Sequence, residues 1–109
     1  MGRVKFISEI SSNHNNDMVR IKETIDASSS IGCDGIKFQL FKIEELFSKE
    51  ILSKSKMHRD RKLWELKEEF IPEIAQYCKK LGIKFGCTPF YIDGVNILSR
   101  HVEFFKIAS

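Results

Sequence analysis

Four short runs rich in β-forming residues recur along the chain, and each run ends in polar or ionisable side chains. They lie at residues 4–10, 35–40, 83–87 and 104–108. Segments of helical character separate the runs, so strands and helices alternate along the sequence. This alternation predicts the α/β class with a parallel sheet, because consecutive parallel strands need a crossover connection between them.

Helix signals lie in the segments between the runs. Asp17 can cap a helix that begins at Met18, and Gly32 is placed to end it, since a glycine commonly follows a helix. A short helix is predicted over residues 92–98. Residues 41–64 form a long, charged excursion whose structure the pattern does not resolve.

The helix before the third run has apolar residues at helical spacing between positions 66 and 81. Pro72 would break a helix interior, because proline lacks an N–H and its ring clashes with the preceding turn. We therefore expect the regular helix to begin near Glu68 or later, with Pro72 in its first turn, and to end at Gly82.

Length and composition bound the architecture. A complete (β/α)8 barrel needs about 250 residues, so the 109 residues of this chain provide less than half of one. A hydrophobic content of 42% argues against disorder, and no run approaches the ~20 apolar residues of a membrane span. No cleavable signal follows Met1, and the three cysteines lack metal-type spacing, so we expect a cytoplasmic protein with reduced thiols.

Charged residues inside the strands indicate a binding site. Lys37 and Gln39 share one face of the second run, opposite to apolar residues, and Lys106 interrupts the fourth run in the same way. A lysine in a buried strand is costly unless it is paired. We expect both lysines to point into a barrel or across a sheet, where they would receive an anion such as phosphate or carboxylate.

The pattern alone leaves other interpretations open. The lysines could lie on the open face of an antiparallel sheet, and Glu9 could be the ion-pair partner of one of them. Asn13 and His14 are turn formers, and Thr88 before a proline could simply end a strand. None of these fragments is specific by itself.

Taken in order, four segments resemble the sialic acid synthase family. They read SEISSNHNND from residue 8, GCDGIKFQLFKIEEL from 32, YCKKLGIKFGCTPF from 77 and VEFFKIAS from 102. The resemblance runs from about Val4 to Ser109 and implies the N-terminal portion, about four strands, of a TIM-type (β/α)8 barrel. Residues 1–109 would then be a partial barrel domain, without the rest of the barrel and the antifreeze-like domain of this family.

The resemblance also implies a reaction. The family condenses phosphoenolpyruvate with N-acetylmannosamine or a related amino sugar and releases phosphate, and legionaminate or pseudaminate synthases are the neighbouring alternatives. A divalent metal, Mn or Mg, would polarise the sugar aldehyde as a Lewis acid. The family's metal-binding histidines belong to later strands, so we assign no metal ligand within this chain.

The resemblance implies roles for particular residues of this chain. Glu9 matches the family's active-site glutamate near the reacting centre. The substrate-binding positions that it implies are Lys37, Gln39, Thr88, Lys106, Ser109, Asn13 and His14. The sequence departs from the family pattern at Ser11 and Asn16, where the family usually has glycine, and these changes leave the anion-binding residues intact.

Two rival functions belong to other classes. A truncated, non-catalytic module could keep an anion pocket or serve in assembly, and the shortness of the chain favours it. A nucleic-acid binder would use the basic stretch at residues 54–62, but no aromatic residues interleave there to stack on bases. We expect the chain alone to be inactive and to form homo-oligomers, because a partial barrel leaves strand edges unpaired.

Overall fold

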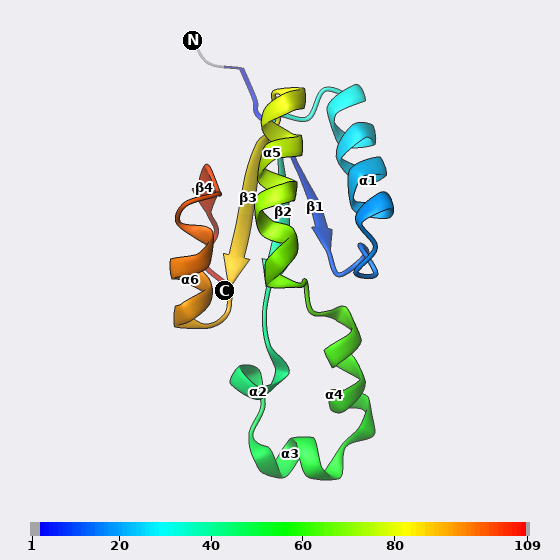
Figure 1. Ribbon diagram of the computed structural model, residues 1–109, viewed down its shortest axis with the longest axis vertical. Helices are drawn as coiled ribbons and strands as arrows, with labels where there is room; N and C mark the ends of the chain where they lie inside the picture. The colour runs from blue at the N-terminus through cyan, green and yellow to red at the C-terminus, as the bar shows by residue number, and fades with distance from the viewer. Residues whose placement is uncertain (1–2, 109) are drawn as a thin grey trace.

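The computed structural model describes residues 3–108 and contains a four-stranded parallel sheet (Figure 1). Its strands, in the order in which they lie side by side, are β1 (Ile7–Ser11), β2 (Gly35–Leu40), β3 (Lys84–Pro89) and β4 (Phe104–Phe105). Each strand pairs in parallel with the next. The predicted α/β class is therefore confirmed, and the antiparallel alternative for the two lysines is wrong.

Helix α1 (Met18–Ser30) follows β1 and begins where the sequence predicts. The Asp17 carboxylate accepts hydrogen bonds from the backbone N–H groups of Val19 and Arg20, which satisfies two donors that the first turn leaves free. Gly32, just beyond the end of α1, has a φ of 89°, a left-handed value that glycine adopts without strain.

Helix α5 (Ile71–Leu81) lies beside α1 and covers the same face of the sheet (Figure 1). Pro72 falls in its first turn, where the missing N–H removes no intrahelical bond, as predicted. Gly82 ends the helix in the left-handed conformation. The third predicted helix is α6 (Ile92–Leu98), which connects β3 to β4 and has the predicted bounds.

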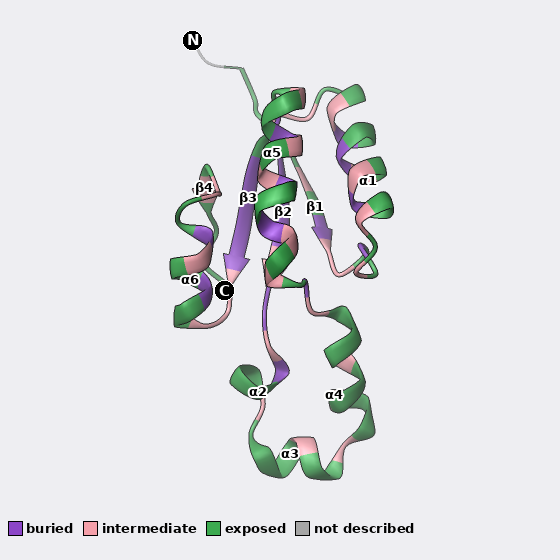
Figure 2. Ribbon diagram, in the orientation of Figure 1, coloured by how far each residue is buried: buried purple, intermediate pink, exposed green. Residues whose placement is uncertain are grey.

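The core lies between the sheet and the helices α1 and α5 (Figure 2). Alternate residues of β2 point into it, so Ile36, Phe38 and Leu40 are fully buried, and Phe38 packs edge-on against Phe85 of β3. Cys78 lies on the buried face of α5, as expected. The remaining buried contributors from the helices are Ile21, Ile25, Ile71 and Ile74.

The opposite face of the sheet carries the polar strand residues. Glu9, Lys37 and Gly86 occupy matching positions on β1, β2 and β3, and Phe104 of β4 is paired with Gly86. The Phe104 ring lies where a side chain at Gly86 would otherwise be. Because glycine leaves this room, the Phe104 ring covers β3 at the level of Glu9 and Lys37, and Thr88 lies two residues further along β3.

The long excursion between β2 and α5 forms an arm, defined here as residues 41–70. It contains three short helices and two 3-10 turns and extends beyond the C-terminal ends of β1, β2 and β3 (Figure 1). The arm helices are α2 (Ile43–Leu46), α3 (Lys49–Lys54) and α4 (Lys56–Asp60). No residue of α3 or α4 is buried, which explains why no apolar periodicity reveals them.

Three strand boundaries differ from those predicted. β1 begins at Ile7 rather than Val4, because the approach of the chain to β2 starts only at Phe6, whose carbonyl accepts from the N–H of Asp34. β3 runs from Lys84 to Pro89 rather than over 83–87. β4 contains two residues instead of five, and its pairing with β3 is limited to Phe104 opposite Gly86 and Phe105 opposite Cys87.

Within residues 3–108, no helix is long and apolar enough to cross a membrane.

Candidate functional site

Three of the predicted residues meet at the centre of the open sheet face. Lys37 of β2 forms an ion pair with Glu9 of β1 and donates a hydrogen bond to Thr88 Oγ1 of β3 at 3.1 Å. Lys37 is 9% exposed, whereas the Glu9 side chain is 43% exposed. The pairing explains how the sheet holds a buried ammonium group, because a carboxylate and a hydroxyl both accept from it.

A cavity of about 300 Å³, here called the anion cavity, opens over this cluster. The residues that line it are Glu9, Lys37, Gln39, Thr88, Phe90, Lys106 and Ala108. Lys106 follows β4, and its backbone N–H donates to the Cys87 carbonyl at 3.1 Å, which fixes it beside the end of β3. Two ammonium groups and one carboxylate leave the cavity with a net positive charge, which suits an anionic ligand.

An irregularity in β1 places Glu9 and the neighbouring polar groups. The register between β1 and β2 shifts between Glu9 and Ser11, and the Ser11 N–H donates to Glu9 Oε2 at 3.0 Å. The Ser11 hydroxyl donates to Gln39 Oε1 at 3.3 Å. Bulges commonly re-aim a side chain beside a site, and here the bulge turns two side chains of β1 toward the ends of β2 and β3.

The two positions at which the sequence departs from the family's glycines both adopt left-handed conformations. Ser11 has a φ of 55° and Asn16 a φ of 51°. Asparagine tolerates this region better than serine does. The backbone therefore keeps the glycine-like geometry, and each replacement adds a side chain that forms a hydrogen bond.

The loop residues Asn13 and His14 do not join the anion cavity. His14 is fully buried on the helix-covered side, its ring centroid lies 6.5 Å from that of Phe38, and its Nδ1 accepts from the Asn16 N–H. Burial lowers the pKa of His14, so the ring is held neutral. Asn13 is exposed, and its carbonyl accepts from Arg20 Nε. Their predicted contact with a substrate stays a prediction.

Cys87 of β3 does not line the anion cavity. Ser109 lies outside the described residues. Cys87 precedes Thr88 but is buried on the opposite side of β3, and burial raises the pKa of its thiol to about 12. This thiol stays protonated near neutral pH and is a poor nucleophile.

The described residues do not form a metal site by themselves. Within residues 3–108, no group of three or more His, Cys, Asp or Glu side chains is placed to hold a metal ion. Among the described residues, Glu9 is the one carboxylate that lines the anion cavity, and it is already paired with Lys37. The divalent metal that the resemblance implies therefore stays an expectation.

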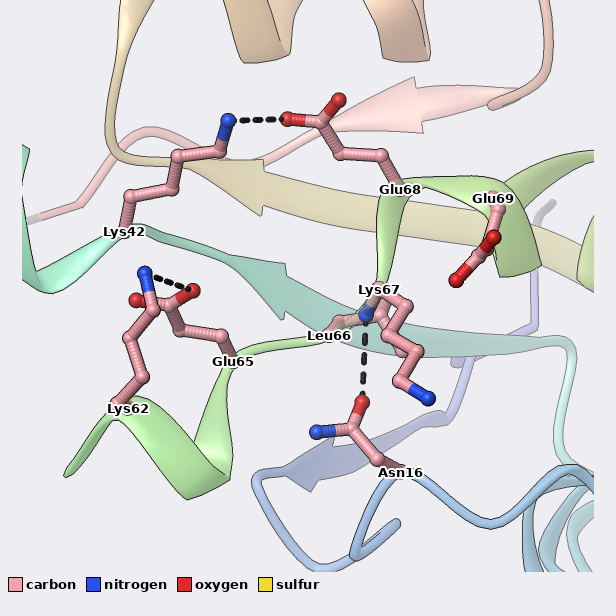
Figure 3. Close-up of a pocket in the computed structure, with 8 residues that line it drawn as sticks. All are labelled: Asn16, Lys42, Lys62, Glu65, Leu66, Lys67, Glu68 and Glu69. Carbon is pink, nitrogen blue, oxygen red and sulfur yellow. Dashed lines mark hydrogen bonds and ion pairs between the residues drawn. The ribbon is translucent and has the colours of Figure 1, made fainter. Parts of the chain in front are cut away.

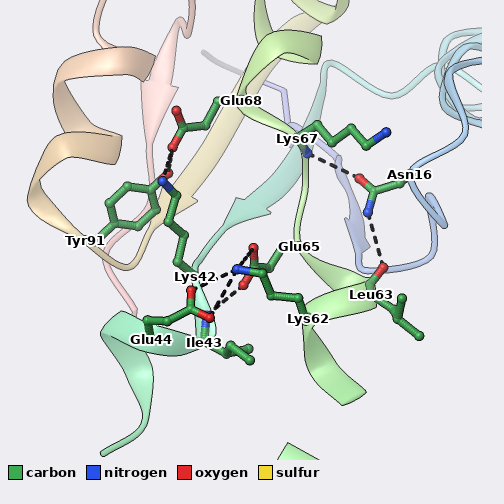
Figure 4. A network of polar contacts seen from close by, with 10 residues as sticks. All are labelled: Asn16, Lys42, Ile43, Glu44, Lys62, Leu63, Glu65, Lys67, Glu68 and Tyr91. Carbon is green, nitrogen blue, oxygen red and sulfur yellow. Dashed lines mark hydrogen bonds and ion pairs between the residues drawn. The ribbon is translucent and has the colours of Figure 1, made fainter. Parts of the chain in front are cut away.

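Ion pairs connect the first residues of the arm to its last turns (Figure 4). Lys62 pairs with Glu44 at 2.9 Å and with Glu65 at 3.3 Å, and the Glu65 carboxylate accepts from the Ile43 N–H at 2.8 Å. The hydrogen bond from Lys62 lowers the pKa of Glu44. These contacts join the start of α2 to the last turns of the arm.

A second cluster joins the arm to the segment after β3. Lys42 pairs with Glu68 at 2.9 Å, and the Tyr91 hydroxyl donates to Glu68 at 2.6 Å. The hydrogen bonds from Tyr91 and Lys42 lower the pKa of Glu68, and burial together with Glu68 raises the pKa of Tyr91. Glu68 therefore stays ionised and holds both ends of the arm beside α6.

A larger cavity of about 510 Å³ lies between the start of the arm and its return to α5 (Figure 3). Asn16, Lys42, Lys62 and residues 65–69 line it. Both Lys42 and Lys62 already pair with carboxylates, so the cavity has less positive charge to offer than the anion cavity. We therefore place the candidate site at the strand ends.

Sequence reasoning missed the aromatic and basic residues of the arm. Phe47, Arg61 and Trp64 border a separate cavity of about 240 Å³, together with Gln39 and Phe90 of the sheet ends. The arm reads as a charged excursion in sequence, and no periodic pattern links its aromatic residues to the strand ends. Only the fold brings them together.

Comparison with known proteins identifies the family. The sequence model of the NeuB family matches residues 24–109. An uncharacterized protein of Methanocaldococcus jannaschii is 39% identical over 94% of this chain and 30% of its own length. An N,N'-diacetyllegionaminic acid synthase of Campylobacter jejuni is 30% identical over 100% of this chain and 36% of its own length.

The fold comparison agrees with the sequence comparison. The chain is similar to the crystal structure of the N-acetylneuraminic acid synthetase of Leptospira borgpetersenii in complex with citrate, with a TM-score of 0.86 and 28% identity. That match covers 97% of this chain and 36% of the solved one. The chain thus spans about a third of the length of these relatives and corresponds to the N-terminal portion of their TIM-type barrel. On these grounds the chain belongs to the NeuB family.

Proposed function

We propose that this chain supplies the phosphoenolpyruvate-binding part of a synthase that condenses this substrate with N-acetylmannosamine or a related amino sugar and releases phosphate. The observation that carries the proposal is the buried ammonium group of Lys37, held beside Thr88 and Glu9 in a positively charged cavity. The relatives named as legionaminic acid and sialic acid synthases support the same reaction class.

The chemistry of the cavity suits this substrate. Phosphoenolpyruvate carries a phosphate and a carboxylate, and Lys37 and Lys106 offer one ammonium group to each. Thr88 Oγ1 accepts from Lys37, so its own O–H is free to donate to a substrate oxygen. The relative solved with citrate also accommodates a ligand that bears carboxylates.

The proposed reaction forms a carbon–carbon bond and releases phosphate. A carbon–carbon bond forms between the methylene carbon of phosphoenolpyruvate and the aldehyde carbon of the sugar, and the aldehyde oxygen takes up a proton. Water adds to the carbon that bears the phosphate, and the bond to phosphate then breaks to leave a keto acid. Glu9 lies beside Lys37 and receives the proton of the attacking water, while the lysines stabilise the negative charge that develops.

A diacetamido sugar is a second candidate for the acceptor. The Campylobacter jejuni relative and another from Legionella pneumophila, 32% identical over 94% of this chain, are both named as N,N'-diacetyllegionaminic acid synthases. The reaction at the anion cavity would be the same for either sugar, and the difference would lie where the sugar substituents contact the protein.

The first test is the affinity for phosphoenolpyruvate, measured by calorimetry for Lys37→Ala, for a control variant and for Glu9→Gln. Lys37→Ala removes a charge-assisted hydrogen bond of ~1.5–3 kcal/mol, which corresponds to binding weaker by about 10–100-fold. Lys79→Ala is the matched control, because Lys79 is an exposed lysine of α5 on the covered side of the sheet. Equal affinity in Lys37→Ala and Lys79→Ala would refute the proposal.

Glu9→Gln should act in the opposite direction. The Glu9 carboxylate occupies Lys37 in the free protein and repels an incoming anion, so its neutralisation should tighten the binding of phosphoenolpyruvate. Since the Glu9 side chain is partly exposed, we expect a change of only about fivefold. Weaker binding in Glu9→Gln would mean that the carboxylate positions Lys37 and does not compete with the ligand.

A further inference from the structure

Ser11, the last residue of β1, has a backbone conformation that serine rarely adopts. Its φ of 55° lies in the left-handed region, where the Cβ of a residue crowds the following carbonyl oxygen. The other non-glycine residues with a positive φ among residues 3–108 are Asn15 and Asn16, and asparagine tolerates this region. Backbone strain persists beside functional sites, so the strain at Ser11 points to a role for its side chain.

Ser11 connects two residues that line the anion cavity. Its backbone N–H donates to Glu9 Oε2 at 3.0 Å, and its hydroxyl donates to Gln39 Oε1 at 3.3 Å. The shifted register of the bulge pairs Ser11 with Phe38, next to Gln39 in β2. Glycine at this position would relax the backbone and keep the first contact, but it would lose the second. The hydroxyl is therefore what serine adds.

The contact with Ser11 leaves the Gln39 amide nitrogen for a ligand. An amide oxygen accepts hydrogen bonds and an amide nitrogen donates them, so the bond to the oxygen turns the nitrogen away from Ser11. Within residues 3–108, Gln39 Nε2 donates no hydrogen bond, and it is not among the buried atoms that lack a partner. Gln39 lines the anion cavity with Lys37 and Thr88, so an accessible donor remains beside the buried ammonium group.

The orientation of this amide decides whether it attracts or repels an anion. The N–H groups of Gln39 attract an anionic oxygen, whereas the amide oxygen in the same place would repel it. Lys37 supplies charge without a fixed direction, because an ammonium group acts as a point charge with rotating donors. A planar amide that is held at its oxygen adds donors of fixed direction.

We propose that Ser11 is a positioning residue whose hydroxyl holds the Gln39 oxygen toward β1, so that Gln39 Nε2 donates to an oxygen of the anion bound beside Lys37. This inference rests on the proposed function for the identity of the anion, which it takes to be phosphoenolpyruvate. The strained backbone of Ser11 is then the consequence of placing a hydroxyl at this point of the bulge.

Two substitutions separate the hydroxyl from the backbone. Ser11→Gly and Ser11→Ala both remove the hydroxyl, but only glycine relieves the strain of a positive φ. Both variants should bind phosphoenolpyruvate about three- to tenfold more weakly in calorimetry. The midpoint of thermal unfolding should nevertheless be higher in Ser11→Gly than in Ser11→Ala. Ser30→Ala is the matched control, because the Ser30 hydroxyl bonds only to the Ala27 carbonyl at the end of α1.

The side-chain amide signals of Gln39 report on its orientation directly. The chain has two glutamines, and the other one, Gln76, is exposed on α5 and serves as an internal control. In an amide nitrogen–proton correlation spectrum, phosphoenolpyruvate should shift the Gln39 side-chain pair and leave that of Gln76 in place. The shift should shrink in both Ser11 variants. In a Gln39→Ala background, Ser11→Gly should weaken binding no further, since Ser11 acts through Gln39.

Titration with inorganic phosphate separates this inference from the proposed function. Equal affinity for phosphoenolpyruvate in the unaltered chain and both Ser11 variants, or a loss in Ser11→Ala alone, overturns the positioning role and leaves the proposed function standing. If phosphate binds as tightly as phosphoenolpyruvate and both anions depend on the Ser11 hydroxyl, the positioning role stands and the proposed substrate fails. If neither anion binds to the unaltered chain, both are overturned.

Discussion

The ammonium group of Lys37 is stable inside the sheet because its two acceptors come from the two flanking strands. Glu9 of β1 supplies a charge and Thr88 of β3 a hydroxyl, so the cost of burial is offset from both sides. The register of the three parallel strands brings these groups together. The same contact that stabilises the lysine also places it where an anion can reach it.

His14 gives a pH dependence at the residue scale. Burial lowers its pKa below the 6.5 of an unfolded histidine, so between the two values the unfolded chain binds more protons than the folded chain. The contribution of His14 to the free energy of unfolding should therefore be constant above pH 6.5. Below pH 6.5 the free energy of unfolding should decrease by up to ~1.4 kcal/mol for each pH unit. Urea unfolding between pH 7.5 and 5 measures this slope.

Two variants separate the effect of His14 from that of other groups. His14→Gln keeps an acceptor for the Asn16 N–H but cannot titrate, so the slope between pH 6.5 and 5 should flatten. His101→Gln, at a partly exposed site, should keep the slope of the unaltered chain. An unchanged slope in His14→Gln would contradict this account of the buried ring.

Sequence reasoning finds some of these residues and not others for a physical reason. Lys37 and Gln39 stand out because a strand alternates faces, so a charge on one face contrasts with apolar neighbours on the other. His14 does not stand out, because a turn has no such periodicity and composition does not tell which side chain points inward. Arg61 is hidden in the same way by the charged sequence around it.

At the scale of elements, the outer part of the arm, which contains α3 and α4, depends on polar contacts instead of a core. The side chains of Ser48 and Ser55 cap α3 and α4, and no residue of either helix is buried. Asn16, in the loop before α1, forms two hydrogen bonds with the C-terminal part of the arm. Its Nδ2 donates to the Leu63 carbonyl, and its Oδ1 accepts from the Lys67 N–H, both at 3.2 Å.

Asn16→Gly should loosen the arm although its backbone conformation suits glycine. Loss of the two hydrogen bonds should speed hydrogen exchange of the Lys67 amide, whereas amides of β2 and β3 should exchange as before. Asn15→Gly is the control, because Asn15 has the same left-handed conformation and an exposed side chain. Equal exchange at Lys67 in both variants would show that the arm does not depend on Asn16.

The sequence predicts some helices and strands and does not predict others. The bounds of β2 and α6 and the start of α1 follow from strand alternation, a cap and apolar spacing. The arm helices are four to six residues long and bury little, so their hydrophobic pattern is too short to read. β4 is shorter than predicted because only Phe104 and Phe105 pair with β3, and the residue pattern does not reveal how far that pairing extends.

At the scale of the whole molecule, the decisive feature of residues 3–108 is a sheet with two unpaired edges and one uncovered face. β1 and β4 form the edges, and apolar side chains are exposed at both, including Phe6 near β1 and Phe105 of β4. Exposed apolar edges promote pairing with another chain. We therefore propose that residues 1–109 alone associate with further copies of themselves.

Light scattering over a concentration series tests this association. The mass should rise with concentration, and Phe105→Lys should shift the chain toward the monomer, because a charge at the edge disfavours pairing. Ile31→Lys is the control, since Ile31 is also an exposed apolar residue but lies at the end of α1. A monomer at every concentration would contradict the proposal.

The amide nitrogen–proton correlation spectrum of the chain, recorded with and without phosphoenolpyruvate, tests whether the strand ends form the anion site. We predict dispersed signals that shift around Lys37, Thr88 and Lys106 on addition of the ligand, and the loss of these shifts in Lys37→Ala. Shifts confined to the basic residues of the arm, or a dispersed spectrum that does not respond to the ligand, would contradict the assignment of the strand ends as the anion site.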